Sequence, residues 1–338
     1  MPADMKPIAA SARRLADDHP PARTVALRAV HESVGGPTPT TAATNPLGIS
    51  LTAALIAIRH DAPMVLATMN GTHDMLPSSP YQSAGHPTLD DCLRGAVAQQ
   101  TGLIIGHAEQ LLAFADHGNG LAIGYLALTR ATVAIPQGAQ WRSWYDYLPW
   151  EDWRNGRPPI LAEAILPRLR EWSLSIDPQP ATTLPQALSR GDRIRMAFGL
   201  DRAPWNEERV ADRYELLSDA GLLDAGSLSS RSLRADHARV LANAIGTLRT
   251  KLKTRPVIFE LMEPEFTLFE LQKTVEAILG PHLHKQNFRR LVESAGLVEP
   301  TGEVRAKTGG RPAKLFRFRH EVLMERPAPG VRVHAQHG

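Results

Sequence analysis

The stretch His284-Lys285-Gln286-Asn287-Phe288-Arg289-Arg290-Leu291-Val292-Glu293-Ser294-Ala295-Gly296 decides the fold of the C-terminal part of the chain. Its apolar residues recur at positions i, i+3, i+4 and i+7, namely Phe288, Leu291, Val292 and Ala295. This spacing predicts a helix with one buried face. Gln286 and Arg290 would point directly away from that face, Asn287 and Arg289 would flank them, and Lys285 precedes them. Side chains of these types suit base edges and phosphates in a DNA major groove.

The residues before this stretch predict a second helix. Phe266-Thr267-Leu268-Phe269-Glu270-Leu271 contains a capping box, in which Thr267 is followed three residues later by Glu270, and a hydrophobic staple between Phe266 and Leu271. We expect this helix to end at Gly280-Pro281. Two helices joined by a tight turn form the frame that places the second helix in a DNA groove.

The residues after the stretch predict a basic hairpin, or wing. Val298–Arg305 and Ala313–Arg319 can pair as strands around Lys307-Thr308-Gly309-Gly310-Arg311-Pro312. Arg311 would enter a minor groove, while Arg305, Lys307 and Lys314 would neutralise phosphates. The alternative is a solvated basic hairpin on a three-helix bundle. Charge, helix order and hairpin agree with one another, which favours DNA binding.

Basic charge is concentrated in this module. Residues 281–320 hold nine Lys/Arg and three Asp/Glu, a net charge of +6, although the whole 338-residue chain carries only +3. Residues 1–280 are therefore slightly acidic. Such a charge asymmetry is expected of a small domain that meets phosphates.

Composition also bounds the class of protein. A hydrophobic content of 43% is enough for folded cores, and 338 residues allow two domains and an extension. The single cysteine, Cys92, excludes an internal disulfide. No apolar run approaches the roughly 20 residues that span a bilayer, and no secretory leader is recognised, so we expect a cytoplasmic protein without a membrane partner.

The N-terminal half predicts a mixed α/β domain. Leu51–Arg59 and Met64–Thr68 are expected as strands joined by His60-Asp61-Ala62-Pro63, and Thr88–Gln100 as a helix stopped by Gly102. A buried strand is expected at Leu121–Leu128. Further helices are predicted at Thr24–Val34, Ile160–Leu174, Asn206–Ala220 and Ala235–Leu252, with a Pro-rich joint at Asp177–Pro185.

The segment Gly85–Leu103 resembles the Nudix box, G-x5-E-x7-R-E-U-x-E-E-x-G-U, where U is a bulky aliphatic residue. Aligning it on Gly102-Leu103 places Ala96 at one glutamate and Gln99 and Gln100 at the glutamate pair. In Nudix hydrolases these carboxylates hold a divalent metal against pyrophosphate, and Mg²⁺ prefers carboxylates. We therefore expect no catalytic residue, no metal site and no required cofactor. The alternative is an ordinary amphipathic helix, with Leu89, Leu93 and Val97 as its apolar stripe.

An aromatic segment, Trp141-Arg142-Ser143-Trp144-Tyr145-Asp146-Tyr147-Leu148-Pro149-Trp150, either covers a core or lines a pocket. In a pocket, Trp144, Tyr145 and Trp150 would stack on a nucleotide ring and Arg142 would face phosphate. Arg94 and Gln99, on the Nudix-like helix, complete the candidate ligand-binding residues.

Four stretches together resemble the Nudix-related transcriptional repressors of NAD metabolism. They are the aromatic segment, Lys251–Leu261, His284–Arg290 and Gly310–Phe318, and they are most similar to the NadQ-type branch and more distantly to the NrtR-type regulators. The resemblance implies an α+β chain in which a Nudix-like α/β/α sandwich precedes a winged helix-turn-helix domain. It also implies a homodimer, a palindromic operator near NAD biosynthesis genes, and a regulatory nucleotide such as NAD, ADP-ribose or ATP.

The expected division is an N-terminal arm (1–45), a Nudix-like sensing domain (46–180), a helical connector (181–245), a winged helix domain (246–325) and a tail (326–338). Two other functions stay open. One is an active Nudix hydrolase of ADP-ribose or a related nucleoside diphosphate derivative that uses Asp90, Asp91 or Glu109 as metal ligands. The other is a double-stranded RNA or structural adaptor, for which DNA sequence would not matter.

Overall fold

The computed structural model describes residues 48–70, 73–81, 88–116, 120–130, 135, 138–175, 188–223, 228–306, 312–325 and 329–331. The strands are β1 (Ile49–Arg59), β2 (Ala62–Asn70), β3 (His73–Met75), β4 (Ser78–Pro80), β5 (Ala108–Asp116), β6 (Gly120–Leu128), β7 (Ala139–Ser143), β8 (Val298–Arg305) and β9 (Ala313–Phe318). The α-helices are α1 (Leu89–Thr101), α2 (Leu166–Leu174), α3 (Arg190–Phe198), α4 (Val210–Asp219), α5 (Ala235–Thr254), α6 (Leu268–Leu279), α7 (Lys285–Ala295) and α8 (Val322–Glu325). Short 3-10 and π turns are η1 (Trp144–Asp146), η2 (Pro149–Glu151), η3 (Leu161–Ile165) and η4 (Val257–Leu261).

Strands β1 to β7 form one mixed sheet. Its main order is β3-β2-β1-β6-β5, with β4 paired to β1 and β7 paired to β2. Among the named strands, β1 and β6 pair in parallel and the other pairs are antiparallel. Strands β1 and β2 form a hairpin. His60 and Asp61, at its tip, have φ of 49° and 58°, the left-handed backbone that two-residue hairpin turns require. The predicted strand pair is confirmed, although Ala62 and Pro63 belong to β2 rather than to the turn.

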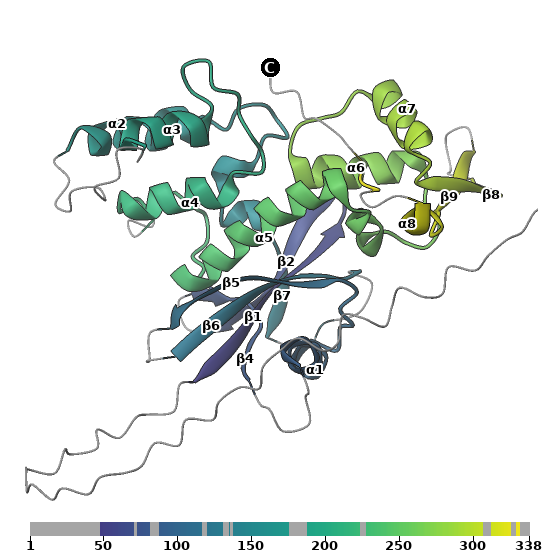
Figure 1. Cartoon of the computed structure of the whole chain (residues 1–338), viewed down its shortest axis with the longest axis horizontal. Coiled ribbons are helices and arrows are strands. Elements are labelled where there is room, and N and C mark those ends of the chain that lie inside the picture. The colour runs from purple at the N-terminus through teal and green to yellow at the C-terminus, as the bar shows by residue number, and fades with distance from the viewer. Residues whose placement is uncertain are drawn as a thin grey trace, which may run out of the picture. The chain divides into compact units, whose positions relative to one another are not determined.

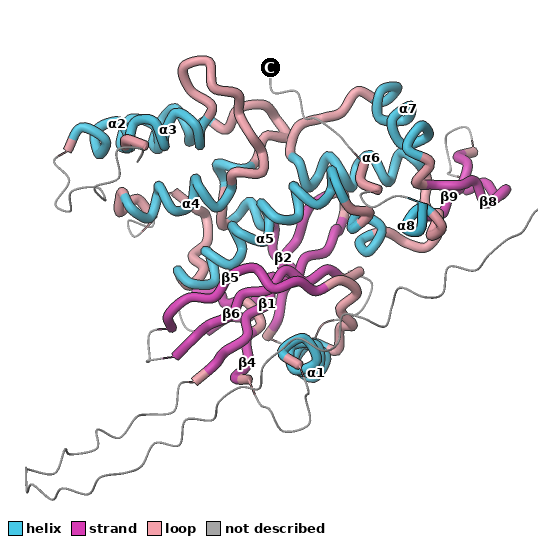
Figure 2. The backbone as a smooth tube through the Cα atoms, viewed as in Figure 1, coloured by secondary structure: helices cyan, strands magenta, loops and turns pink. Residues whose placement is uncertain are grey.

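Helices cover both faces of this sheet. Side chains alternate along β1, so that Ala54 and Ile56 join the core under α5, whereas Leu51 and Leu55 join the core under α1. Figures 1 and 2 show α5 and α1 on opposite sides of the strands. The expected α/β/α sandwich is therefore confirmed, and the chain is α+β.

Close packing of α5 depends on a glycine in the sheet. A Cβ atom added to Gly124 of β6 would lie 2.8 Å from Cγ2 of Val240 on α5. That contact is too short for carbon atoms, so only glycine lets the helix approach the strand this closely.

Local signals set the ends of α1 as expected. The Thr88 side chain accepts a hydrogen bond from the Asp91 backbone N–H, and Gly102 ends the helix at φ 69°. Cys92 is buried on its inner side, as its apolar neighbours suggest. The predicted helix and its stop at Gly102 are confirmed, although α1 runs from Leu89 to Thr101, one residue later at each end.

Helices α6 and α7 and the β8–β9 hairpin form a winged helix. The capping box is present in full, since Thr267 Oγ1 accepts from the Glu270 N–H and the Glu270 carboxylate accepts from the Thr267 N–H. Phe288 and Val292 are buried on the inner face of α7. The predicted helix pair and wing strands are confirmed, except that β9 ends at Phe318, one residue early.

Several elements differ from the sequence expectations. Strands β3, β4, β5 and β7 and helices α3 and α8 were not predicted. The helix expected at Ile160–Leu174 begins as the π turn η3, and α4 begins only at Val210 because Asn206 Oδ1 accepts from the Glu208 N–H in a turn. The helix expected at 24–34, the N-terminal arm and the Pro-rich joint lie outside the described residues. Residues 45–338 cluster as one compact unit, so the division into smaller domains stays a prediction.

No helix within the described ranges has the length and apolar character to cross a membrane.

Candidate nucleic-acid interface and ligand-sensing site

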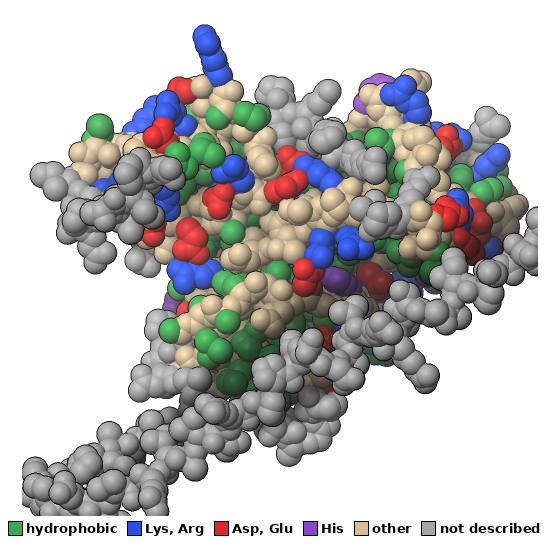
Figure 3. Space-filling view, viewed as in Figure 1, with side chains coloured by type: hydrophobic (Ala, Val, Ile, Leu, Met, Phe, Trp, Pro, Cys, Tyr) green, Lys and Arg blue, Asp and Glu red, His purple; other side chains and the backbone are tan. Residues whose placement is uncertain are grey.

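The outer face of α7 is polar and exposed. Phe288 and Val292 turn inward, which leaves five polar side chains toward solvent: Lys285, Gln286, Asn287, Arg289 and Arg290. Figure 3 shows basic side chains on the surface over α7. This arrangement is the one expected from the apolar stripe alone. It presents two amide side chains and three cations on one helix face, which suits base edges together with phosphates.

One of these cations has an exchangeable partner. Arg289 Nε donates to Glu293 Oε1 at 2.8 Å, and both side chains are about half exposed or more. An exposed pair of this kind contributes little to stability, about 0–1 kcal/mol. A phosphate can therefore replace Glu293 as the partner of Arg289 at little cost.

The wing residues divide into three groups. Lys314, on β9, is exposed as expected of a phosphate contact. Arg305, on β8, is half-buried and donates to Glu270 Oε1 at 2.7 Å and to the Glu265 carbonyl. Because Glu270 also closes the capping box, Arg305 holds the wing against the start of α6, and its proposed phosphate contact must compete with that ion pair. Lys307 and Arg311 lie outside the described residues.

Comparison with known proteins bears on this part of the chain. Residues 258–318 match a family model described as the NrtR DNA-binding winged helix domain. The C-terminal part of this chain is thus similar to NrtR-type DNA-binding winged helix domains. The chain is also 42% identical over 86 residues to a protein of Acinetobacter baylyi named ADPR responsive transcriptional repressor NtrR. The matched region covers 25% of this chain and 34% of that protein. It thus spans about a third of the length of the curated relative that it matches.

Two solved structures are similar over most of the chain. One is NrtR of Shewanella oneidensis complexed with a 27mer DNA, at 18% identity and a TM-score of 0.48, covering 82% of this chain and 95% of that one. The other is a MutT/nudix family protein of Enterococcus faecalis, at 15% identity and a TM-score of 0.47, covering 81% and 87%.

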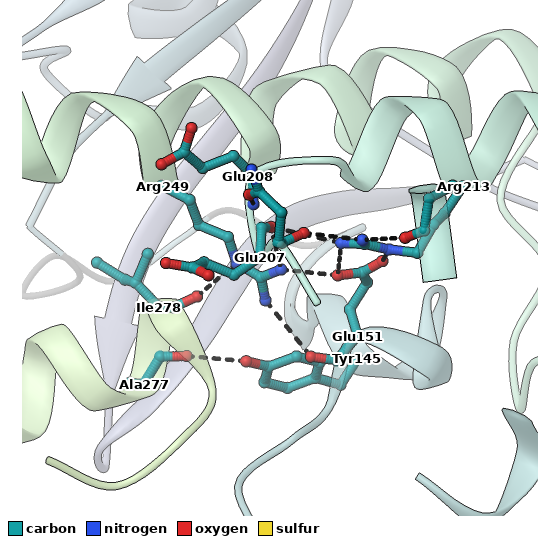
Figure 4. A network of polar contacts seen from close by, with 10 residues as sticks. Tyr145, Glu151, Glu207, Glu208, Arg213, Arg249, Ala277 and Ile278 are labelled. Carbon is teal, nitrogen blue, oxygen red and sulfur yellow. Dashed lines mark hydrogen bonds and ion pairs between the residues drawn. The ribbon is translucent and has the colours of Figure 1, made fainter. Parts of the chain in front are cut away.

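A buried charge network joins the end of the sheet domain to the winged helix (Figure 4). Glu151, at the end of η2, is fully buried and accepts two hydrogen bonds from Arg213 of α4, at 2.5 and 2.9 Å. Its Oε2 also accepts from Arg249 Nη1 at 2.7 Å. Arg249 in turn donates from Nε to the Ile278 carbonyl of α6. One carboxylate thus connects the turn after β7, helices α4 and α5, and the first helix of the winged domain.

The charge on Glu151 is stabilised by its two partners. Burial alone would raise the pKa of this carboxyl, but Coulomb attraction and hydrogen bonds from Arg213 and Arg249 outweigh it and hold the pKa below its ordinary value. Sequence reasoning missed this network. The available signal was the presence of Arg213 and Arg249 on the apolar faces of their helices, beside Leu217 and Leu248, where an unpaired arginine would be costly.

The aromatic segment is part of the core. Trp144, Tyr145 and Trp150 are all buried and belong to the cluster under α5. The Tyr145 hydroxyl donates to the Ala277 carbonyl of α6 at 3.0 Å, as Figure 4 shows. Trp144 and Tyr145 are enclosed by other residues, whereas Trp150 also borders a pocket beside α4 and the start of α5. The expectation that these rings stack on a nucleotide stays a prediction. The alternative expectation was that the segment covers a core, and large aromatic side chains fill a core well.

The other candidate ligand residues lie on different faces of the sheet. Arg142, on β7, pairs with Val65, whose side chain belongs to the core under α5. Arg94 and Gln99 lie on α1, which covers the opposite face. Arg94 donates to Asp90 and to the Ile105 carbonyl, while Gln99 is exposed. The structure does not bring Arg142 together with Arg94 and Gln99. A role in ligand binding therefore stays a prediction for each of these residues.

The carboxylates of the hydrolase alternative are divided in the same way. Asp90 is paired with Arg94, and Asp91 accepts from the Thr88 hydroxyl, both on α1. Glu109 lies on β5 and contacts Lys251 of α5 at 2.8 Å, on the other face. Among the described residues, Glu109 is therefore not placed to share a metal ion with the two aspartates.

A second buried carboxylate lies on the edge strand β3 of the sheet. Asp74 of β3 accepts from the Tyr147 hydroxyl at 2.6 Å and from Arg231 Nε at 2.8 Å. Burial would raise the pKa of Asp74, but these hydrogen bonds hold it below its ordinary value. Burial and the hydrogen bond to Asp74 raise the pKa of Tyr147, which keeps its hydroxyl a donor.

Proposed function

We propose that this chain is a transcriptional repressor of NAD biosynthesis genes that binds operator DNA through α7 and the wing. The observation that carries the proposal is the exposed polar face of α7 on an NrtR-type winged helix. Gln286, Asn287 and Arg290 supply donors and acceptors for base edges, while Lys285 and Lys314 supply phosphate contacts.

The proposal includes a regulatory nucleotide bound by the sheet domain. The relative from Acinetobacter baylyi is named as ADPR responsive, so ADP-ribose is the first ligand to test, ahead of NAD and ATP. A ligand changes operator affinity only by its differential affinity for the two arrangements of the protein. The Glu151 network supports such coupling, because this buried carboxylate contacts Arg249, which also donates to the Ile278 carbonyl of α6.

A homodimer completes the proposal. A two-fold axis would place two α7 helices in successive major grooves, and a palindromic operator would match that symmetry. A repressor acts where its operator lies, so the proposal places this chain in the cytoplasm.

The proposal treats the chain as a sensor without hydrolase activity. Ala96, Gln99 and Gln100 stand at the positions of the Nudix glutamates, and an amide oxygen brings no negative charge to a hard cation. Mg²⁺-dependent hydrolysis of ADP-ribose by the purified protein, lost on Asp90→Asn or Asp91→Asn, would contradict this part of the proposal.

The test is fluorescence anisotropy with DNA from upstream of NAD biosynthesis genes and a scrambled duplex of equal composition. We expect Arg290→Ala to bind the upstream DNA more weakly than the parent. Arg193→Ala on α3, which removes an exposed arginine paired with Asp219, is the matched control and should bind like the parent. Equal binding by both variants and the parent would contradict docking through α7.

A further inference from the structure

A pocket of about 540 Å³ opens between the start of β3, the turn η2, helix α4 and the start of α5. Its wall includes the side chains of His73, Tyr147, Tyr214, Arg231, Ser232 and Arg234. The described residues that line it include two arginines and a histidine and no carboxylate. The volume falls in the range of about 300–1,000 Å³ that small-molecule sites occupy. The pocket is thus sized and charged for a small anion with a ring or chain attached.

The donors around the pocket are only partly used within the protein. Arg234 contacts Asp236 at 3.3 Å and has 41% of its side chain exposed. Its Nε is buried and has no acceptor among the described residues. His73 Nδ1 is 2.7 Å from the Ser232 hydroxyl, and that hydrogen bond leaves Nε2 available. The exposed part of the Arg234 side chain and Nε2 of His73 can donate to an added anion without breaking a buried ion pair.

The start of α5 adds a further contribution. Arg234 is the N-cap of this 20-residue helix, and no side chain caps its first turn. Unpaired N–H groups at a helix N-terminus favour negative charge nearby. The helix end and the arginine side chains act on the same pocket, since Ala235 and Ala238 belong to its lining.

We propose that this pocket binds a small phosphate-bearing molecule, with phosphate oxygens held by Arg234, His73 and Ser232 and the remainder against Tyr147 and Tyr214. Arg231 adds positive charge but stays tied to Asp74. The pocket lies on the α5 side of the sheet, because Tyr147 and Tyr214 belong to that core. It is therefore distinct from the Nudix-like helix α1 on the opposite face, and the inference goes beyond the DNA-binding function proposed above.

Two kinds of molecule carry the phosphate group that this pocket would recognise: a nucleotide with a diphosphate group, and free inorganic phosphate or pyrophosphate. Isothermal titration calorimetry of the full chain, without DNA, separates them with three probes: sodium pyrophosphate, AMP and ADP-ribose. Tighter binding of ADP-ribose than of pyrophosphate identifies a nucleotide site, and equal or weaker binding identifies an inorganic anion site. Either order supports the pocket if the variants below behave as expected.

Two charge reversals provide the decisive comparison. Arg234→Glu places a carboxylate on the pocket wall and should weaken the binding of pyrophosphate at least tenfold. Arg209→Glu is matched to it, because Arg209 has 35% of its side chain exposed, contacts Asp212 at the same distance of 3.3 Å and does not line the pocket. That control should leave the affinity within twofold of the parent.

Three results would overturn the proposal. They are no saturable heat with any probe, equal weakening by Arg234→Glu and Arg209→Glu, or binding that Arg290→Glu on α7 abolishes while Arg234→Glu leaves it intact. The last result would place the anion on the DNA-binding face. Since no DNA is present, a failure of operator binding would not affect the outcome, so this proposal and the DNA-binding proposal fail separately.

Discussion

Replacing Glu151 with glutamine tests whether the buried charge network holds the fold together. Glutamine keeps the size and one carbonyl oxygen of glutamate but carries no negative charge. Arg213 and Arg249 would then face each other's charge in the interior, where their side chains are 0% and 1% exposed. The change therefore removes the compensating charge without opening a cavity.

The expected loss is large. Removing one partner of a buried ion pair costs about 3–5 kcal/mol, because the remaining charge cannot be solvated. Here two guanidinium groups lose the same partner, so we expect the free energy of unfolding to fall by about 4 kcal/mol or more. Small domains are stable by only about 5–15 kcal/mol, so this variant would be marginal.

Urea unfolding followed by tryptophan fluorescence measures the loss. Trp144 and Trp150 are fully buried and lie within a few residues of Glu151, so their emission reports on this part of the core. Asp152→Asn is the matched control, since Asp152 pairs with Arg154 at 2.7 Å near the surface. Asp152 and Arg154 are partly exposed, and water can solvate the arginine when the carboxylate is removed, so the control should lose much less stability than Glu151→Gln.

A Glu151→Gln variant whose free energy of unfolding lies within about 1 kcal/mol of the Asp152→Asn control would contradict this expectation. Such a result would mean that solvent reaches the arginines, or that they relax to other acceptors. The same variant also bears on coupling, because Arg249 holds the Ile278 carbonyl of α6.

Further predictions follow from single features. Arg290→Ala should cost about 1–3 kcal/mol on the operator and relax sequence preference, as measured by anisotropy on operator and mismatched duplexes. Lys314→Ala should weaken binding to all duplexes alike and reduce the salt slope by about 1. Thr267→Ala should lower the free energy of unfolding by about 1 kcal/mol in urea, because it removes the side-chain half of the capping box with Glu270. The folded-state pKa of Glu151 lies below its ordinary 4.5, so its contribution to stability is complete above that pH and is lost as pH falls through the folded-state value. Urea unfolding at decreasing pH should therefore show a loss that is smaller in Glu151→Gln.

Each of these predictions has a contradicting outcome. Operator discrimination equal to that of the parent in Arg290→Ala would exclude base contacts by this residue. A sequence-dependent defect in Lys314→Ala would exclude a pure phosphate contact. An unchanged unfolding midpoint in Thr267→Ala would show that the cap adds nothing in solution. Equal acid sensitivity of the parent and Glu151→Gln would assign the pH dependence to other carboxylates.

The parts of the fold that the sequence predicted correctly rest on local signals. The ends of α1 follow from Thr88 and Gly102, whose capping roles depend on residues within one turn. The start of α6 follows from Thr267 and Glu270 in the same way. For α7, the spacing of its apolar residues sufficed to identify both the buried face and the polar face offered to DNA.

The parts that the sequence did not predict depend on contacts between distant segments. Strand β5 contains Glu109 and Gln110 and shows no clear alternation, and it is a strand because β6 pairs with it. The Glu151 network joins residues 62 and 98 positions apart. The aromatic segment reads equally well as pocket or core in sequence, and only the packing of α5 and α6 against it decides for core.

The most direct test of the central claim is fluorescence anisotropy of the purified protein on its upstream DNA and on a scrambled duplex, at fixed physiological salt, with and without ADP-ribose. We expect tight binding to the upstream DNA alone and a change of at least fivefold in that affinity when ADP-ribose is added, equivalent to about 1 kcal/mol of coupling. Weak and equal binding to both duplexes, unaffected by the nucleotide, would contradict it.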